Sequence, residues 1–139
     1  MWNTRISSLS PSCIRILIGL NDIAVIKNTG LDPDSALETF QANYEMLIEN
    51  IRQKFDCPII LMETFIFSRP AEYITWEPLV RKMNERIKAI AYKYNLYFLP
   101  SWSALTDSSL SPDGIHLTEK GQRILADLWL HFTKNMNLI

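Results

Sequence analysis

The feature that most constrains the fold is a short apolar stretch, residues 14–18, which ends abruptly at Gly19. Ile16, Leu17 and Ile18 are consecutive, so their side chains point to both faces of a strand. That pattern is typical of a strand buried on both sides within a parallel sheet. Glycine lets the backbone turn sharply or come close to a ligand. The stretch therefore predicts a buried parallel strand that ends in a turn.

An amide and a carboxylate, Asn21 and Asp22, follow this turn directly. In open α/β sheets, ligands bind at the carboxyl ends of the strands. Asn21 carries two N–H donors on a short side chain, which suits it to donate to the oxyanion formed in acyl transfer. The same two residues can also form a simple side-chain turn. Taken alone, this stretch favours the simple turn.

A second polar motif lies near the other end of the chain, where Asp113 and His116 are three residues apart across a Pro-Asp-Gly turn. A carboxylate placed in this way can accept from one imidazole nitrogen and fix the tautomer. The other nitrogen is then free to act as a general base. This spacing is common, however, and by itself indicates a turn with a surface histidine.

Together, Gly-x-Asn-Asp after a buried strand and Asp-Gly-x-His before a last helix resemble the SGNH hydrolases, also called GDSL-type esterases and lipases. The resemblance implies that Asn21 is the oxyanion donor, His116 the catalytic base and Asp113 the residue that orients it. Gly19 and Asp22 would shape the site. The implied activity is ester hydrolysis on a small-molecule ester or acylated substrate, with no cofactor and no metal.

The amino-terminal part of the sequence departs from the family's pattern. The family opens with a Gly-Asp-Ser motif whose serine is the nucleophile, and a second motif supplies an oxyanion glycine. Gly19 is the first glycine of this chain. The serines that precede it lack that context: Ser7, Ser8, Ser10 and Ser12. We therefore expect no nucleophile in this chain, and this chain alone to be inactive.

Two classes of function remain open. The first is a hydrolase of this family whose serine is supplied from elsewhere. The second is a non-catalytic remnant or interaction module of the same fold. A Gly-Asp-Ser motif in frame upstream of Met1 would favour the first class.

Apolar runs alternate with helical patterns, which predicts an α/β fold with a parallel sheet. Strands are expected near residues 14–18, 58–63 and 96–99, in that spatial order. The resemblance, which runs from about residue 13 to residue 132, implies a flavodoxin-like three-layer sandwich of the SGNH hydrolase type. The fold would be truncated to three parallel strands with flanking helices.

The expected domain organisation follows from the same patterns. Residues 1–12 are expected to be an irregular amino-terminal segment, residues 13–135 a partial hydrolase domain, and residues 136–139 a tail. In the family, the first strand lies beside the strand at residues 14–18. We therefore expect this strand to have an open edge through which the chain can self-associate.

Helix boundaries are expected from caps and apolar stripes. Residues 23–34 are expected to form a loop, followed by a helix that begins with a capping box at Ser35. Another helix is expected to begin at Thr75, with Pro78 in its first turn. The last helix is expected to be capped by Thr118.

The loop at residues 65–74 contains three aromatic side chains that would either line an acyl pocket or cover the core: Phe65, Phe67 and Tyr73. Asn84, on the helix that follows, is assigned a packing role only.

Composition and charge exclude several classes of protein. Hydrophobic residues make up 47% and charged residues 21% of the chain, which is typical of a globular domain rather than a disordered one. A net charge of -1 gives no electrostatic reason to expect a nucleic-acid partner. No membrane-spanning run or signal peptide is seen, so a cytoplasmic location is the default expectation.

The remaining titratable candidates are interpreted as structural. Cys13 and Cys57 lack the spacing of a metal site and are expected to be buried thiols rather than a disulfide. His131 is far in sequence from any acid–base partner and is expected to lie at the surface.

Overall fold

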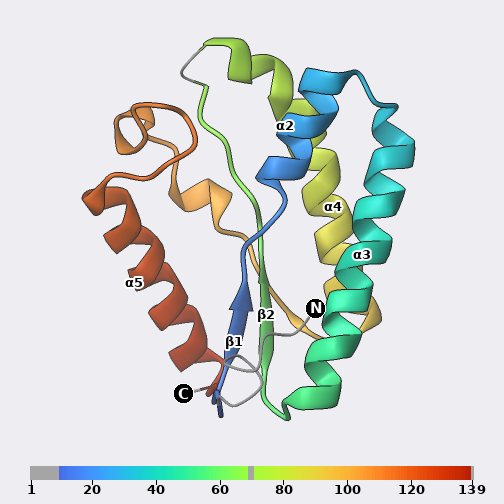
Figure 1. Cartoon of the computed structure of the whole chain (residues 1–139). Coiled ribbons are helices and arrows are strands. Elements are labelled where there is room, and N and C mark those ends of the chain that lie inside the picture. Colours follow the sequence, from blue (N-terminus) through green and yellow to red (C-terminus); the bar gives the residue numbers. More distant parts are fainter. Residues whose placement is uncertain (1–9, 69–70, 139) are drawn as a thin grey trace.

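A computed structural model describes residues 10–68 and 71–138 of the chain. The helices and strands are, in order, β1 (Ile14–Ile16), α2 (Leu20–Thr29), α3 (Pro33–Lys54), β2 (Ile59–Met62), α4 (Glu77–Lys93), β3 (Tyr97–Leu99) and α5 (Glu119–Asn135). Three 3-10 turns join them, η1 (Ala71–Trp76), η2 (Trp102–Ala104) and η3 (Ser108–Leu110). Figure 1 shows their arrangement.

The strands form one parallel sheet in the order β1-β2-β3, as the sequence predicts. Ile14 of β1 pairs with Ile59 of β2, and Ile60 of β2 pairs with Tyr97 of β3. All residues of the central strand β2 are buried, which explains its uninterrupted apolar sequence.

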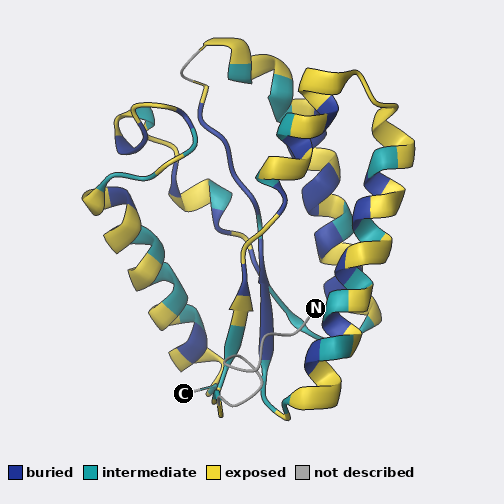
Figure 2. Ribbon diagram, viewed as in Figure 1, coloured by how far each residue is buried: buried dark blue, intermediate teal, exposed yellow. Residues whose placement is uncertain are grey.

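Helices cover both faces of this sheet (Figure 1). Ile59 and Leu61 belong to the core shared with α3 and α4, whereas Ile60 and Met62 pack against α5. The alternation follows from the two-residue period of a strand. The α/β, three-layer arrangement of three parallel strands with flanking helices is therefore confirmed, with buried residues concentrated between the layers (Figure 2).

The first strand differs from its prediction in length and in burial. β1 ends at Ile16, and Leu17 and Ile18 are 39% and 41% exposed rather than buried. Within the described part of the chain, no strand lies on the outer side of β1. Apolar residues that would be covered in the middle of a sheet are therefore left facing solvent here.

The loop predicted at residues 23–34 is wrong, because most of it belongs to helix α2. Ile23 and Ile26 are buried on the inner side of this helix. Gly30 ends it in the left-handed conformation, with φ 69°. This ten-residue helix is difficult to recognise in the sequence, because it has turn-forming residues at both ends and only two buried positions.

The start of α3 is also corrected. Asp32, not Ser35, is the N-cap: its carboxylate accepts from the backbone N–H of Ser35 at 3.0 Å, and Pro33 occupies the first turn. The hydrogen bond donated by the backbone N–H of Ser35 holds the pKa of the Asp32 carboxyl below its usual value. Asp32 and Pro33 thus start the helix earlier than the capping-box pattern indicates.

Thr75 does not cap α4. It lies within η1, where its hydroxyl donates to the carbonyl of Glu72 at 2.7 Å, and α4 begins at Glu77. Pro78 is in the first turn of α4, as predicted. The cap of the last helix is confirmed, because the Thr118 hydroxyl accepts from the N–H of Gly121 at 3.1 Å.

The other expectations concern the surface and the thiols. His131 is exposed on α5. Cys13 and Cys57 are free and half-buried, and burial raises the pKa of both thiols. None of the helices in residues 10–68 and 71–138 is long and apolar enough to cross a membrane. Residues 1–9 of the expected amino-terminal segment lie outside the described residues.

Candidate functional site

The turn at Gly19 positions one side of the candidate site. Beyond β1 the chain passes through Leu17 and Ile18 and turns at Gly19, which has φ 129°. A Cβ atom added at this position would lie 2.5 Å from Sδ of Met83. The glycine is therefore required both by its backbone conformation and by its contact with α4. It allows α2 to begin at the very next residue.

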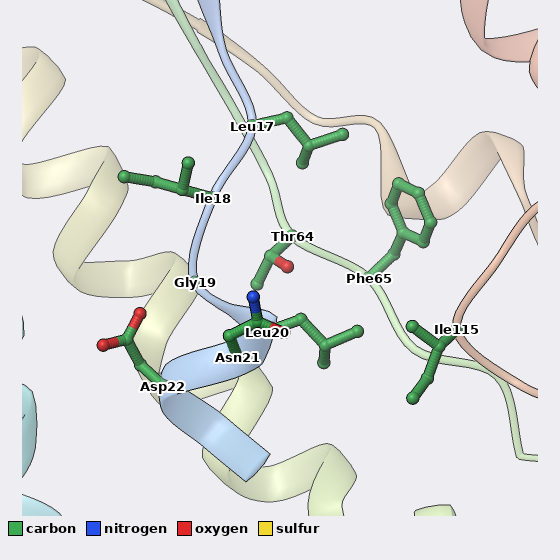
Figure 3. A pocket seen from close by; sticks show the side chains of 9 residues that line it. All are labelled: Leu17, Ile18, Gly19, Leu20, Asn21, Asp22, Thr64, Phe65 and Ile115. Atoms are coloured by element: carbon green, nitrogen blue, oxygen red, sulfur yellow. The ribbon is translucent and has the colours of Figure 1, made fainter. Parts of the chain in front are cut away.

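Asn21 and Asp22 lie in the first turn of α2 at the carboxyl edge of the sheet, and both side chains are exposed. With Gly19 they line a hollow of about 500 Å³ (Figure 3). The Asn21 side chain lies beside Thr64, which follows β2, and it makes no hydrogen bond to another described residue. Its N–H groups are therefore available to a ligand.

One wall of this hollow is apolar. It is formed by Leu17, Leu20, Phe65 and Ile115 (Figure 3). Of the three aromatic residues considered for an acyl pocket, only Phe65 lines the hollow.

The other two aromatic residues pack elsewhere. Phe67 is buried against Leu105 and Leu110. Tyr73 packs on Trp76, with 4.7 Å between the ring centroids. Phe67 and Tyr73 therefore cover other side chains rather than line the hollow.

The Asp113–His116 turn forms a closed set of hydrogen bonds. Oδ1 of Asp113 accepts from the backbone N–H of His116 at 2.7 Å and from that of Ile115 at 2.9 Å. Oδ2 lies 2.7 Å from Nδ1 of His116. The contact expected between carboxylate and imidazole is therefore present. It leaves Nε2 of His116 without a partner among the described residues.

These bonds also set the charge state of Asp113. The pKa of this carboxyl is well below its usual value, chiefly because the backbone N–H of His116 donates to it, then because of the imidazole, then because of the Ile115 N–H. Asp113 is therefore a carboxylate at neutral pH, as required of a group that holds an imidazole in one tautomer.

The turn is anchored to the loop that follows β2. The N–H of Phe67 donates to the carbonyl of Gly114 at 3.1 Å, and the N–H of Thr118 donates to the carbonyl of Leu110 at 2.7 Å. This places Ile115 on the wall of the hollow, but Asp113 and His116 are not among its lining residues. The side chain of His116 is 82% exposed. The chain thus brings Gly19, Asn21, Asp22 and the residue next to His116 to one hollow.

Sequence reasoning missed the role of Asn84. This buried side chain on α4 bonds both backbone groups of Thr64: its Oδ1 accepts from the N–H, and its Nδ2 donates to the carbonyl, each at 2.8 Å. It therefore fixes the segment on which Thr64 and Phe65 enter the hollow. The available signal was an asparagine on the apolar face of a helix, between Val80 and Ile87.

The chain is similar to proteins of one family. The GDSL-like lipase/acylhydrolase family matches residues 1–124. GDSL esterase/lipase WDL1 of Oryza sativa subsp. japonica is 22% identical over 144 aligned residues, which cover 92% of this chain and 55% of that protein.

Solved structures share the fold. A GDSL-like lipase from Parabacteroides merdae superposes with a TM-score of 0.76 at 22% identity, over 96% of this chain and 63% of that one. Axe2, an acetylxylan esterase from Geobacillus stearothermophilus, gives a TM-score of 0.72 at 22% identity, over 91% of this chain and 61% of that one. This chain therefore spans less than two thirds of the length of these relatives.

Proposed function

The chain belongs to the GDSL-like lipase/acylhydrolase family, and from this premise we propose that it supplies the acid–base and oxyanion side of an ester-hydrolysing site. His116 is the base, Asp113 orients it, and Asn21 donates to the oxyanion. Gly19 and Asp22 shape the site around Asn21. The substrate is an ester or an acylated small molecule whose acyl group rests on the apolar wall beside Phe65.

The observation that carries this proposal is the contact of 2.7 Å between Nδ1 of His116 and Oδ2 of Asp113. Asp113 is ionised and accepts from Nδ1–H, so the lone pair of the imidazole is on Nε2. An imidazole in this tautomer takes a proton at Nε2, and the carboxylate stabilises the imidazolium that forms. A merely structural histidine does not require an ionised partner or a free Nε2.

In the proposed reaction, a serine hydroxyl attacks the ester carbonyl while Nε2 of His116 takes the hydroxyl proton. The side-chain amide of Asn21 donates to the oxyanion that develops on the carbonyl oxygen. His116 then gives the proton to the leaving alcohol. Water hydrolyses the acyl-serine by the same two steps, which releases the acid.

The proposal places the nucleophilic serine outside the described residues. Ser10 and Ser12 precede β1, so they lie towards the amino ends of the strands, away from Gly19 and Asn21. Ser101 is buried and donates to the carbonyl of Glu63 at 2.6 Å. Ser111 is buried and bonds Oδ1 of Asp113 at 3.3 Å. Ser7 and Ser8 lie outside the described residues.

The test is complementation. The purified chain is mixed with an amino-terminal segment of a family member that carries Gly-Asp-Ser, and hydrolysis of short-chain nitrophenyl esters is followed. We expect turnover in the mixture that is absent from either part and is lost with His116→Ala. A change at the other, exposed histidine, His131→Ala, is the matched control and leaves turnover unchanged.

The competing function is a non-catalytic remnant or interaction module of this fold. This function is favoured if the mixture forms a complex but does not hydrolyse the esters. Hydrolysis by the chain alone that disappears in His116→Ala would instead place the nucleophile among Ser7, Ser8, Ser10 and Ser12.

A further inference from the structure

Thr64 differs from the other buried polar residues because its side chain has no hydrogen bond to another described residue. The buried threonine, serine and asparagine residues within 10–68 and 71–138 are Thr64, Asn84, Ser101, Ser111 and Thr133. The side chains of the other four all bond described residues. Buried hydroxyl groups are normally paired, because an unpaired one has lost its bonds to water. The hydroxyl of Thr64 therefore requires an explanation.

This hydroxyl opens onto the hollow beside Asn21. Thr64 is only 3% exposed, yet it lines the hollow, and its side chain lies next to that of Asn21 (Figure 3). Among the described residues, the side-chain N and O atoms that are both unpaired and inaccessible to solvent belong to Tyr44 and Trp129. The Thr64 oxygen is not one of them, so it reaches the surface of the hollow. It is therefore available to a ligand.

The backbone that carries this hydroxyl is firmly held. Asn84 bonds the N–H and the carbonyl of Thr64, each at 2.8 Å. The N–H of Glu63 donates to the carbonyl of Leu99 at 3.0 Å, and the carbonyl of Glu63 accepts from the hydroxyl of Ser101 at 2.6 Å. All the backbone polar groups of residues 63 and 64 are therefore paired. Because threonine branches at Cβ and has few rotamers, the position of its hydroxyl is also restricted.

The groups around this hydroxyl indicate what it can bind. Thr64 has one O–H to donate, and the neighbouring Asn21 amide has two N–H groups. The residues that line the hollow include no lysine, arginine or histidine, and the carboxylate of Asp22 points away from Thr64 (Figure 3). Two neutral donors side by side suit an oxygen atom on which negative charge develops during a reaction.

The apolar wall indicates which oxygen this is. Phe65, the residue after Thr64, is part of that wall. An ester whose acyl group rests on Phe65 has its carbonyl carbon directly beside the acyl group, and so brings its carbonyl oxygen to Thr64 and Asn21. The order of Thr64 and Phe65 in the chain thus matches the order of carbonyl and acyl group in the substrate.

We infer that the hydroxyl of Thr64 is a second donor to the oxyanion, and that it converges with the Asn21 amide on one oxygen of the bound ester. This inference rests on the proposed function. Thr64 is then a catalytic residue that touches the reacting oxygen, and Asn84 is a positioning residue that holds it. Because the negative charge on this oxygen is largest in the transition state, the bond from Thr64 lowers the barrier more than it strengthens substrate binding.

The test uses the complemented mixture, in which an amino-terminal segment of a family member supplies the serine. Thr64→Val removes the hydroxyl but keeps the shape of the side chain, whereas Thr64→Ser keeps the hydroxyl. We expect Thr64→Val to lower kcat on nitrophenyl acetate about tenfold with KM unchanged, and Thr64→Ser to recover most of the loss. Thr133→Val is the matched control and leaves kcat unchanged, because the hydroxyl of this buried threonine bonds carbonyls within α5.

A substrate with sulfur in place of the carbonyl oxygen separates a donor from a merely structural residue. Sulfur is a weak acceptor, so a thionoester gains little from the Thr64 hydroxyl. We expect Thr64→Val to slow hydrolysis of nitrophenyl thionoacetate by less than about twofold. Amide hydrogen exchange at Thr64 should be as slow in Thr64→Val as in the unaltered chain, which reports that the bonds of Asn84 are intact.

The chain alone gives a readout that needs no serine. The probe is acetate, the acid released from an acetyl ester, whose oxygens carry negative charge. Its binding is followed by NMR from the side-chain amide of Asn21, which is identified as the signal missing from Asn21→Ala. We expect the dissociation constant for acetate to rise about tenfold in Thr64→Val and to change by less than about twofold in Thr64→Ser.

Three results would overturn the inference. The first is an unchanged kcat in Thr64→Val. The second is an equal loss with the ester and the thionoester that Thr64→Ser does not recover, which means that the residue is structural. The third is a loss that disappears when Thr64→Val is combined with Asn21→Ala, which means that Thr64 acts only through the Asn21 amide.

The inference and the proposed function can fail separately. Hydrolysis that requires His116 but not the hydroxyl of Thr64 keeps the proposed function and rejects the inference. A mixture that does not hydrolyse esters rejects the proposed function. Acetate binding that depends on the Thr64 hydroxyl then keeps the pair of donors, whereas acetate binding that is absent or independent of this hydroxyl rejects the pair as well.

Discussion

The two sides of the candidate site, the Asp113–His116 turn and the hollow beside Asn21, are built in different ways. On one side, Asp113 accepts four hydrogen bonds from residues 111, 115 and 116 of its own turn, and that turn is bonded to the loop after β2. On the other side, Asn21 and Asp22 make no side-chain bond to a described residue, and their position depends on the backbone turn at Gly19. We call the first the bonded side, because hydrogen bonds within the chain hold its side chains, and the second the open side, because its side chains have no such bonds to described residues.

The difference teaches what each side requires from the rest of the protein. The groups that we propose to hold a proton, Asp113 and His116, are fixed by nearby residues of the same chain. The proposed oxyanion donor, Asn21, makes no hydrogen bond to another described residue. We therefore expect loss of the Asn84 bonds beneath the hollow, or a side chain added at Gly19, to lower stability, and removal of the exposed Asn21 side chain to have little effect on stability.

The largest expected effect is the absence of catalysis in the chain alone. Loss of the nucleophile in a triad enzyme costs roughly a millionfold in turnover. Loss of one oxyanion donor, here the glycine of the family's second motif rather than Asn21, costs on the order of a hundred- to a thousandfold. The purified chain should therefore hydrolyse short-chain nitrophenyl esters no faster than His116→Ala. A rate that depends on His116 would mean that the chain already contains a nucleophile beside the open side.

The next effect compares an asparagine beneath the hollow with one at its open side. Asn84→Ala leaves the N–H and carbonyl of Thr64 buried without partners, which should lower the free energy of unfolding by about 4 kcal/mol. Asn21→Ala removes an exposed side chain and should change it by less than about 0.5 kcal/mol. Urea unfolding of the two variants measures both values. An equal loss of unfolding free energy in Asn21→Ala would show that the Asn21 side chain is held by bonds within the chain.

Two glycines at the ends of α2 give a smaller difference. Gly19→Ala introduces a Cβ atom at φ 129° and 2.5 Å from Met83 Sδ, which should cost about 3 kcal/mol. Gly30→Ala introduces one at φ 69° with no atom within 4 Å and should cost about 1 kcal/mol. Thermal unfolding measures the difference. Equal costs would mean that Met83 and the turn relax, and that the position of Asn21 is not fixed by the backbone.

The smallest effect is a local titration. Asp113 should titrate below the ordinary value for aspartate, measured from its carboxyl ¹³C shift. In His116→Ala this pKa should rise only in part, because the backbone N–H groups of residues 115 and 116 still donate. Asp107, whose pKa is lowered by the N–H of Ser109, is the control and should not change. A complete return of Asp113 to the ordinary value would show that the imidazole alone fixes its charge.

The sign of the linked stability follows from the direction of the shift. A lowered pKa means that the folded state favours the carboxylate of Asp113. Its contribution to stability is therefore present above about pH 4, the ordinary pKa of an aspartate, and is lost as the pH falls through the lowered value. The contribution should be small because the group is exposed.

Local patterns carried most of what the sequence predicts. The apolar runs of β1, β2 and β3 and the order of the strands follow from chemistry within a few residues and from the alternation of elements. The contact of Asp113 with His116 follows from a turn of four residues. Each of these features depends on near neighbours in the chain, and each is found in the structure.

Features with a short local pattern, or with partners in distant parts of the chain, were not predicted. α2 has only two buried residues, so its helical period is too short to detect. The bonds of Asn84 require β2 to end over α4, twenty residues away in sequence. Leu17 and Ile18 have the composition of a buried strand, but their burial depends on a neighbour that the described residues do not provide.

The strands lie in the sheet in the same order as in the chain, β1-β2-β3. Each strand can therefore add to the one before it as the polypeptide is synthesised, and none has to insert between two that are already paired. A further strand outside β1 displaces no existing pair and threads through no loop. Such a terminal element can be gained, lost or carried on a separate polypeptide while the topology of the remaining sheet stays the same.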